Sequence, residues 1–209
     1  AALAGDFRLH APATGRNRGP IAEVLSDWLP QRVQTGGQLL ELASGTGEHA
    51  VFLATRFPGL TWQPSDPDPD HRRSIDAYRR IEGPANLLAP LDIDVTQADW
   101  PLAAPVDVMV CCNMIHIAPW TATEGLFAGA GRYLKAGGGL FLYGPFKRAG
   151  MHTAPSNAAF DVSLRQRDPT WGVRDLADVA ALAAAAGLAA PEIREMPANN
   201  LSLWFARHA

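Results

Sequence analysis

Residues 39–49 read LLELASGTGEH and carry the strongest fold signal in the chain. The apolar run at 38–43 is typical of a short buried strand, and the small residues at 44–47 turn the chain into a helix expected at about 48–56. Glycine lets a backbone approach a ligand closely, and the first turn of a helix presents unpaired amides toward it. Because ligands of open α/β sheets bind at the carboxyl ends of parallel strands, we expect a nucleotide-binding loop here.

Two nucleotide chemistries use such a loop. A dinucleotide fingerprint, GxGxxG, would take Gly45 and Gly47 as its first two glycines and Ala50 at the third position. Glu41 favours the other chemistry, because a carboxylate at the strand end would repel a pyrophosphate but can accept hydrogen bonds from a cationic amino-acid ligand. The pattern Glu-x-small-x-Gly-x-Gly resembles motif I of class I S-adenosylmethionine-dependent methyltransferases, with Ala43 replacing the usual first glycine. An ordinary strand–helix turn is the remaining alternative.

The strand–turn–helix pattern repeats along the chain, which predicts an α/β fold with a doubly wound, mostly parallel, Rossmann-like sheet. The C-terminal segments 192–196 and 201–206 are joined by a turn at 197–200 and predict an antiparallel hairpin. Further strands are expected at 60–65, 87–93, 106–112 and 138–143, and helices at 20–28, 71–81, 123–134 and 176–186.

Composition limits the function classes. The chain has 209 residues, of which 47% are hydrophobic and 19% charged, as in one ordered domain. The formal net charge of -3 shows no basic excess, so we expect no nucleic-acid partner. Cys111 and Cys112 are adjacent and the six histidines are scattered, so we expect neither a disulfide framework nor a metal site.

The expected location is the cytoplasm. Residues 1–10 lack the basic start and apolar stretch of a signal peptide. No apolar run reaches membrane-spanning length, so no membrane partner is expected.

Acidic residues follow the next two expected strands. Asp66 comes about 20 residues after the glycine loop, where a carboxylate can accept hydrogen bonds from both ribose hydroxyls. A helix N-cap or an Asx-turn is the alternative role for Asp66. Asp92 and Asp94 end the third expected strand, where class I methyltransferases often contact adenine. We favour Asp94, because residues 95 and 96 lead from it into the loop.

A series of short motifs runs through the chain from Thr14 onward. They are RNRGPI at 16–21, ELASGTGEH at 41–49, WQPSD at 62–66, LDIDVT at 91–96, NMIH at 113–116, TEGLF at 123–127, YGPF at 143–146, NAAFD at 157–161 with Arg165, DPTWG at 168–172 and PANN at 197–200. With these motifs, nearly the whole chain from Thr14 onward resembles the methyltransferase-like 26 family. The resemblance implies a class I methyltransferase fold and S-adenosylmethionine as the cofactor, and it implies no particular substrate. Asn113 lies in one of the matching motifs and is a candidate cofactor residue.

Arg16 and Asn17 precede the first expected helix. They are candidates to clamp the carboxylate of the cofactor, and a solvated arm is the alternative. The candidate cofactor residues are therefore Arg16, Asn17, Glu41, Ala43, Gly45, Gly47, Asp66, Asp94 and Asn113.

Acceptor candidates lie later in the chain. His116 follows the fourth expected strand and can orient or deprotonate an acceptor near neutral pH, or it can cap the next helix. Tyr143 can line an acceptor pocket or belong to the core. The segment at about 146–174, with a short helix expected at 158–166, is interpreted as a lid or acceptor insertion. Asp161 and Arg165 would then face the site, and a surface ion pair between them is the alternative.

The leading hypothesis is methyl transfer from S-adenosylmethionine to a small-molecule acceptor by in-line displacement. The cofactor supplies the activated group, so the protein mainly orients the reactants. The alternatives are a nicotinamide-dependent oxidoreductase and a non-catalytic, cofactor-binding regulatory protein.

Overall fold

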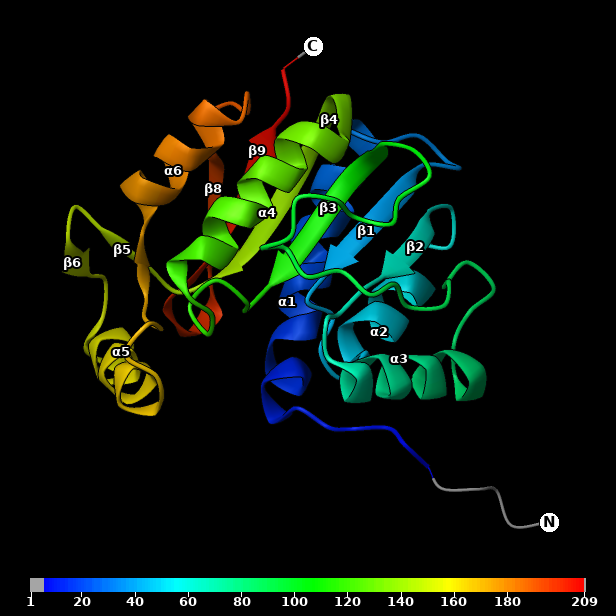
Figure 1. Ribbon diagram of the computed structural model, residues 1–209, viewed down its shortest axis with the longest axis horizontal. Coiled ribbons are helices and arrows are strands. Elements are labelled where there is room, and N and C mark those ends of the chain that lie inside the picture. Colours follow the sequence, from blue (N-terminus) through cyan, green and yellow to red (C-terminus); the bar gives the residue numbers. More distant parts are fainter. Residues whose placement is uncertain (1–5, 209) are drawn as a thin grey trace. The chain divides into compact units, whose positions relative to one another are not determined.

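The computed structural model describes residues 6–208. The first five residues of the segment assessed for a leader peptide therefore lie outside the described residues. Contacts divide the chain into two compact units, Ala1–Asp94 and Val95–Ala209. Each unit is described by itself, with the element labels of Figure 1.

The first unit begins with a helix pair and continues into a parallel strand pair. Strands β1 and β2 run parallel, with Gln38 opposite Thr61 and Glu41 opposite Pro64. Helix α2 connects them, and it contacts both α1 and α3. This β1–α2–β2 crossover confirms the strand–turn–helix prediction for residues 38–64. The elements are α1 (Pro12–Trp28), η1 (Leu29–Gln31), β1 (Gln38–Leu42), α2 (Glu48–Arg56), β2 (Thr61–Pro64) and α3 (Pro69–Ile81).

Two expectations for the first unit are wrong. Helix α1 begins at Pro12 rather than at Pro20, so Pro20 lies inside it. Proline suits the first helical turn at Pro12, and packing of α1 on α2 outweighs the poor helix propensity of the glycines before Pro20. The strand expected at 87–93 is reduced to isolated parallel bridges, Trp62 with Leu87 and Ser65 with Leu91. These bridges lack the continuous ladder that defines a strand.

The second unit contains a mixed sheet with strand order β3-β4-β9-β8. Strands β3 and β4 are parallel and are connected through helix α4, whereas β9 pairs antiparallel with both β4 and β8. The expected C-terminal hairpin is therefore confirmed. Ala198 and Asn199 both have positive φ in its turn, the backbone conformation that tight hairpin turns use. The elements are β3 (Val106–Cys112), α4 (Trp120–Tyr133), β4 (Leu134–Gly144), β8 (Glu192–Met196), η2 (Pro197–Asn199) and β9 (Asn200–Ala206).

The segment at 146–174 is more regular than its sequence indicates. It forms a small sheet of its own, with strand order β6-β5-β7, and the helix expected at 158–166 extends over Pro155–Arg167. Helix α6 follows this sheet and contacts α4, β5 and β7. The elements are β5 (Phe146–Arg148), β6 (Met151–His152), α5 (Pro155–Arg167), β7 (Arg174–Asp175) and α6 (Leu176–Ala185).

None of the helices within residues 6–208 has the length and apolar character needed to cross a membrane. These residues also bring no three histidine, cysteine, aspartate or glutamate side chains together as a metal-binding group.

Candidate functional site

The loop between β1 and α2 has an unusual backbone. Ala43, Gly45 and Gly47 have φ values of 51°, 58° and 92°. A Cβ atom at Gly47 would lie 2.8 Å from the Cα of Ile75 in α3, so both conformation and packing require glycine there. A Cβ atom at Gly45 would meet no atom within 4 Å. The loop is therefore packed on α3 at Gly47 and open at Gly45.

Asp66 holds this loop. Its carboxylate accepts hydrogen bonds from the backbone N–H of Gly45 and of Asp68, both at 2.9 Å, and lies 3.2 Å from Nδ1 of His71. Only 4% of Asp66 is exposed. The Asp68 contact is the Asx-turn considered as an alternative, while Asp68 itself caps α3 by accepting from the N–H of Asp70. Asp66 thus joins the ends of two strands.

Glu41 lies buried at the end of β1. Its Oε2 accepts a hydrogen bond of 2.6 Å from the indole Nε1 of Trp62 in β2. Burial raises the pKa of Glu41 to about 7, although the hydrogen bonds from Trp62 and Ser44 act in the opposite direction. The carboxyl group is therefore poised between its two protonation states near neutral pH.

Arg16 and Asn17 do not precede the first helix, as expected, but lie within α1. The cause is the early start of α1 at Pro12. Arg16 is exposed, whereas Oδ1 of Asn17 lies 2.7 Å from Nε2 of His49 in α2. Burial lowers the pKa of His49 to about 4, so this ring is neutral at pH 7. Asn17 therefore connects α1 to the helix that follows the glycine loop.

Asp92 and Asp94, the two acids at the end of the third expected strand, differ in their surroundings. Asp92 is exposed and forms an ion pair with Arg72 at 3.1 Å. Asp94 is half-buried. The preference for Asp94 as an adenine contact stays a prediction.

In the second unit, Asn113 and His116 lie in the loop that follows β3. Asn113 has a φ of 58°, and its N–H donates to the carbonyl of Tyr143 at 2.9 Å. His116 is 3% exposed, and its ring lies edge-on to Phe160 at 5.7 Å. Its Nδ1 is buried with no hydrogen-bond partner among residues 6–208. Burial and then the charge of Arg174 lower the pKa of His116 to about 4.

Tyr143 is tied to the hairpin turn. Its hydroxyl accepts a hydrogen bond of 3.0 Å from Nδ2 of Asn200, and Nδ2 of Asn157 in α5 donates to the carbonyl of Asn199 at 3.0 Å. Burial raises the pKa of Tyr143, although the Asn200 bond partly opposes this. The end of β4, the start of β9 and the start of α5 are thereby connected through polar side chains.

Asp161 is buried, unlike the carboxylate of a surface ion pair. Its Oδ1 accepts from the N–H of Val173 at 2.7 Å and from Nε of Arg165 at 3.3 Å. Its Oδ2 lies 3.4 Å from Nζ of Lys147 and 3.2 Å from Nε2 of His152. Burial opposes ionisation, but these donors outweigh it and hold the pKa of Asp161 below its ordinary value. Asp161 therefore joins α5 to β5, β6 and the segment before β7.

The structure thus groups the predicted residues within each unit. Glu41, the 43–47 loop and Asp66 come together in the first unit. In the second unit, the segment that carries Gly172 connects His116 and Asp161. The N–H of Gly172 donates to the carbonyl of His116, and Oδ1 of Asp161 lies beside Gly172. Sequence reasoning missed Trp62 and His71 as supports of the acidic residues, and Lys147 and His152 as partners of Asp161. Trp62 lies inside the quoted motif at 62–66 and Lys147 directly follows the one at 143–146, whereas His71 and His152 lie at least five residues from any quoted motif.

Comparison with known proteins identifies the family. The family model described as "Protein of unknown function (DUF938)" matches residues 8–207. The chain belongs to the DUF938 family. This family description states no activity, so it leaves the chemistry to the structure.

Solved structures show the fold of this DUF938 chain. An O-methyltransferase family protein from Burkholderia thailandensis superposes with a TM-score of 0.80 at 19% identity, covering 94% of this chain and 58% of that one. Human N-acetylserotonin methyltransferase in complex with SAM superposes with a TM-score of 0.74 at 14% sequence identity, covering 94% of this chain and 53% of that one. An O-methyltransferase family 2 protein from Planctomyces limnophilus, in complex with apigenin, superposes with a TM-score of 0.76 at 19% sequence identity, covering 93% of this chain and 60% of that one.

These similarities establish the class I methyltransferase fold, in agreement with the fold predicted from the sequence. The chain spans less than two thirds of the length of each of these structures.

Proposed function

We propose that this DUF938 protein transfers a methyl group from S-adenosylmethionine to a small-molecule acceptor. The observation that carries the proposal is the β1–α2 loop, which is open at Gly45 and held there by Asp66. The structurally similar proteins support it, since all three are named as methyltransferases or members of O-methyltransferase families. One was determined with SAM and another with the small molecule apigenin.

The residues of the first unit fit the cofactor. Open space beside Gly45 lets a ligand approach the backbone, and the carboxylate of Asp66 keeps accepting capacity for a ribose hydroxyl beyond its present donors. Glu41, whose pKa is about 7, can form a hydrogen bond with the amino group of the cofactor. When bound, S-adenosylmethionine supplies the activated methyl group for in-line displacement. The residues of the first unit proposed to hold it are Arg16, Asn17, Glu41, Ala43, Gly45, Gly47, Asp66 and Asp94, and Asn113 of the second unit stays a prediction from its motif.

The acceptor chemistry is assigned to the second unit. His116 is neutral at pH 7, and its unpartnered Nδ1 is proposed to orient an acceptor by accepting a hydrogen bond from its hydroxyl, because a pKa of about 4 makes the ring a weak base. Tyr143 would line the acceptor site beside the hairpin turn. Asp161 and Arg165 are proposed as positioning residues that hold α5.

The family resemblance suggests a more specific relationship. We infer that this protein is related to the methyltransferase-like 26 proteins, because of the motifs quoted above. We also propose the cytoplasmic location that is expected from the sequence.

A matched pair of glycine variants tests cofactor binding. Gly45 and Gly36 both have positive φ and open space beside them, but only Gly45 lies in the proposed site. We expect Gly45→Val to weaken S-adenosylmethionine binding at least about tenfold by isothermal titration calorimetry, because its side chain would occupy the ligand space. Gly36→Val should bind as the wild type does. Equal affinities for all three proteins would contradict the proposed loop geometry.

Asp66→Asn provides the second test of the site. Removing the charge should weaken S-adenosylmethionine binding roughly tenfold or more, since charge-assisted hydrogen bonds contribute about 1.5–3 kcal/mol each. Stability should also fall, because the carboxylate holds Gly45 and Asp68. Circular dichroism must therefore accompany the titration. A folded variant of unchanged affinity would remove Asp66 from the site.

Turnover separates the remaining alternatives. We expect formation of S-adenosylhomocysteine when the protein is incubated with S-adenosylmethionine and a library of small hydroxylated acceptors. Binding without product across the library would favour a regulatory protein, and binding of NAD in place of S-adenosylmethionine would favour an oxidoreductase.

A further inference from the structure

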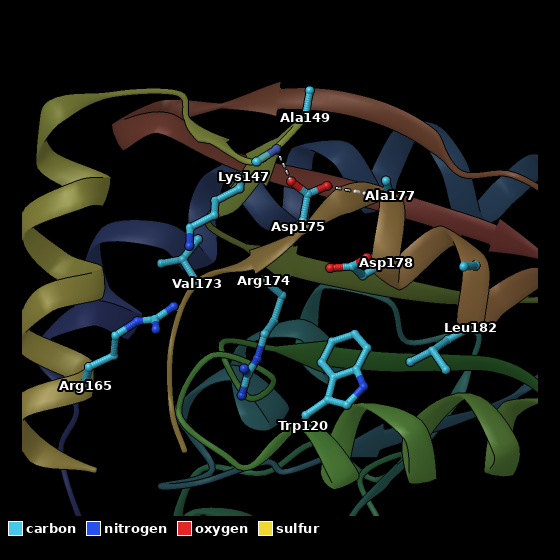
Figure 2. A pocket seen from close by; sticks show the side chains of 12 residues that line it. Trp120, Lys147, Ala149, Arg165, Val173, Arg174, Asp175, Ala177, Asp178 and Leu182 are labelled. Atoms are coloured by element: carbon cyan, nitrogen blue, oxygen red, sulfur yellow. Dashed lines mark hydrogen bonds between the residues drawn. The ribbon is translucent and has the colours of Figure 1, made fainter. Parts of the chain in front are cut away.

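The second unit contains an open pocket of about 900 Å³ between β5, β7, α5, α6 and the start of α4. Figure 2 shows Lys147, Arg165 and Arg174 reaching into this region from three different elements. The pocket has an aromatic and aliphatic wall as well, formed by Trp120, Val173 and Leu182. It therefore combines positive charge with apolar surface.

Lys147 and Arg165 share one carboxylate. Nζ of Lys147 lies 3.4 Å from Asp161, and Nε of Arg165 lies 3.3 Å from it. His152 also approaches the same carboxylate, at 3.2 Å. One buried anion thus serves two basic side chains, and both of them also line the pocket. They retain capacity to bind a second anion.

Arg174 is held by backbone carbonyls. Its Nε donates to Ile115 at 3.1 Å, and its Nη2 donates to Ala118 at 2.7 Å and to Thr170 at 2.9 Å. The guanidinium lies 5.6 Å from the centroid of the Trp120 ring. This arrangement fixes a cation beside a flat aromatic surface without neutralising its charge.

Two acids also line the pocket. Both carboxylate oxygens of Asp175 accept backbone hydrogen bonds, from Gly150 at 2.6 Å and from Ala177 at 2.9 Å, as Figure 2 shows in part. Asp178 is exposed in the first turn of α6. The lining therefore carries three cations against two carboxylates, one of which is occupied by backbone amides, and the buried carboxylate of Asp161 next to Lys147 and Arg165 is a third anion near the pocket.

We propose that this pocket binds a small organic carboxylate with a flat apolar body. The carboxylate interacts with Lys147 and Arg165, and the body packs against Trp120 and Leu182. Binding there requires neither a cofactor nor methyl transfer, so the inference goes beyond the proposed function and can be tested separately from it.

Benzoate is a suitable probe, and benzamide is its neutral counterpart. In an NMR titration of the full chain without cofactor, we expect saturable benzoate-induced shifts of the Gly150 and Ala177 amides, which lie at the pocket. Benzamide should bind at least about tenfold more weakly, because it lacks the charge. Added salt should weaken benzoate binding, since the pocket is open to solvent.

Variants locate the binding. Lys147→Gln and Arg165→Gln should each weaken benzoate binding by about tenfold, whereas Asp178→Asn should strengthen it by removing a like charge. Arg148→Gln is the matched control, because Arg148 is an exposed cation adjacent on β5 that does not line the pocket. Its affinity should stay within about twofold of the wild type.

Several outcomes would overturn the proposal: no saturable shifts, equal binding of benzamide, or equal losses in Arg148→Gln and Lys147→Gln. Arg165 has a side chain that is 54% exposed, so Arg165→Gln keeps the test decisive if Lys147→Gln misfolds. Unchanged binding in a folded Arg165→Gln would also contradict it.

Discussion

Glu41 is a carboxyl group whose burial penalises its ionised form. It lies at the end of β1, where its hydrogen bond from Trp62 offsets only part of the cost of burial. A residue predicted only as a ligand contact therefore also affects the stability of the protein.

The pH dependence of stability tests this role. The pKa of Glu41 rises from 4.5 to about 7 on folding, so its favourable contribution is complete below pH 4.5 and is lost as the pH rises to about 7. Relative to Glu41→Gln, the unfolding free energy of the wild type should fall by about 3 kcal/mol across this window. Urea denaturation at a series of pH values measures the difference. Effects of His49 and His116 are common to both proteins and cancel, so parallel curves would contradict the expected pKa.

A comparison of Gly47 with Gly45 separates the effect of side-chain packing on stability from the effect of backbone conformation. Both have positive φ, but only at Gly47 would a Cβ atom approach a backbone atom, the Cα of Ile75. Gly47→Ala should lower the unfolding free energy by about 2–4 kcal/mol, the combined effect of left-handed strain and overpacking. Gly45→Ala should cost only about 1–2 kcal/mol, from the left-handed strain alone. Urea unfolding of the two variants provides the comparison, and equal losses would show that α3 yields at this contact.

At the scale of elements, the small sheet β6-β5-β7 and helix α5 form one polar-linked segment. Asp161 joins them through the N–H of Val173 and the side chains of Lys147, His152 and Arg165. A lid that moved freely would not need such a buried connection. The connection suggests that the segment is held in place by one carboxylate.

Asp161→Asn should loosen this segment. We expect faster hydrogen exchange of backbone amides across 146–174 and a loss of about 1–3 kcal/mol in stability, since a hydrogen-bonded charge is removed. The pKa of Asp161 is depressed, so its contribution is present above the ordinary value of 3.8 and is lost as the pH falls below it. Asp168→Asn is the control, because its amide oxygen can still accept from Thr170. Equal exchange in both variants would remove Asp161 as the anchor.

At the scale of the whole molecule, the chain carries the class I methyltransferase fold on less than two thirds of the length of the similar structures. Its two compact units divide the predicted residues. All the cofactor candidates except Asn113 lie in the first unit, and the acceptor candidates lie in the second.

Ligand-induced stabilisation tests the proposed function for the complete chain. A ligand at about 100 times its Kd stabilises the folded state by about 2.7 kcal/mol. For a chain of this size, the Tm should rise by roughly 5–10 °C with S-adenosylmethionine. NAD should produce no comparable shift, and the shift with S-adenosylmethionine should be at most about half as large in Gly45→Val, because a tenfold weaker ligand at the same concentration stabilises by only about 1.4 kcal/mol. A larger shift with NAD than with S-adenosylmethionine would reverse the choice of cofactor.

Local patterns in the sequence determined most elements of this protein. Residues 38–56 predicted β1, its turn and α2, because an apolar run, small turn residues and a helical period are neighbours along the chain. The turn at 197–200 predicted the β8–β9 hairpin for the same reason. The strand expected at 87–93 failed because a strand also needs a continuous partner, and local apolar character does not supply one.

The roles of the acidic residues depend on contacts between distant parts of the chain. Asp66 holds Gly45 across 21 residues, Glu41 accepts from Trp62 across 21, and Asp161 accepts from Val173 across 12. The pocket beside Trp120 likewise combines residues from α4, β5, α5, β7 and α6. Hydrogen bonding and burial at these distances depend on the path of the folded backbone. Periodicity reports only which face of its own element a residue occupies.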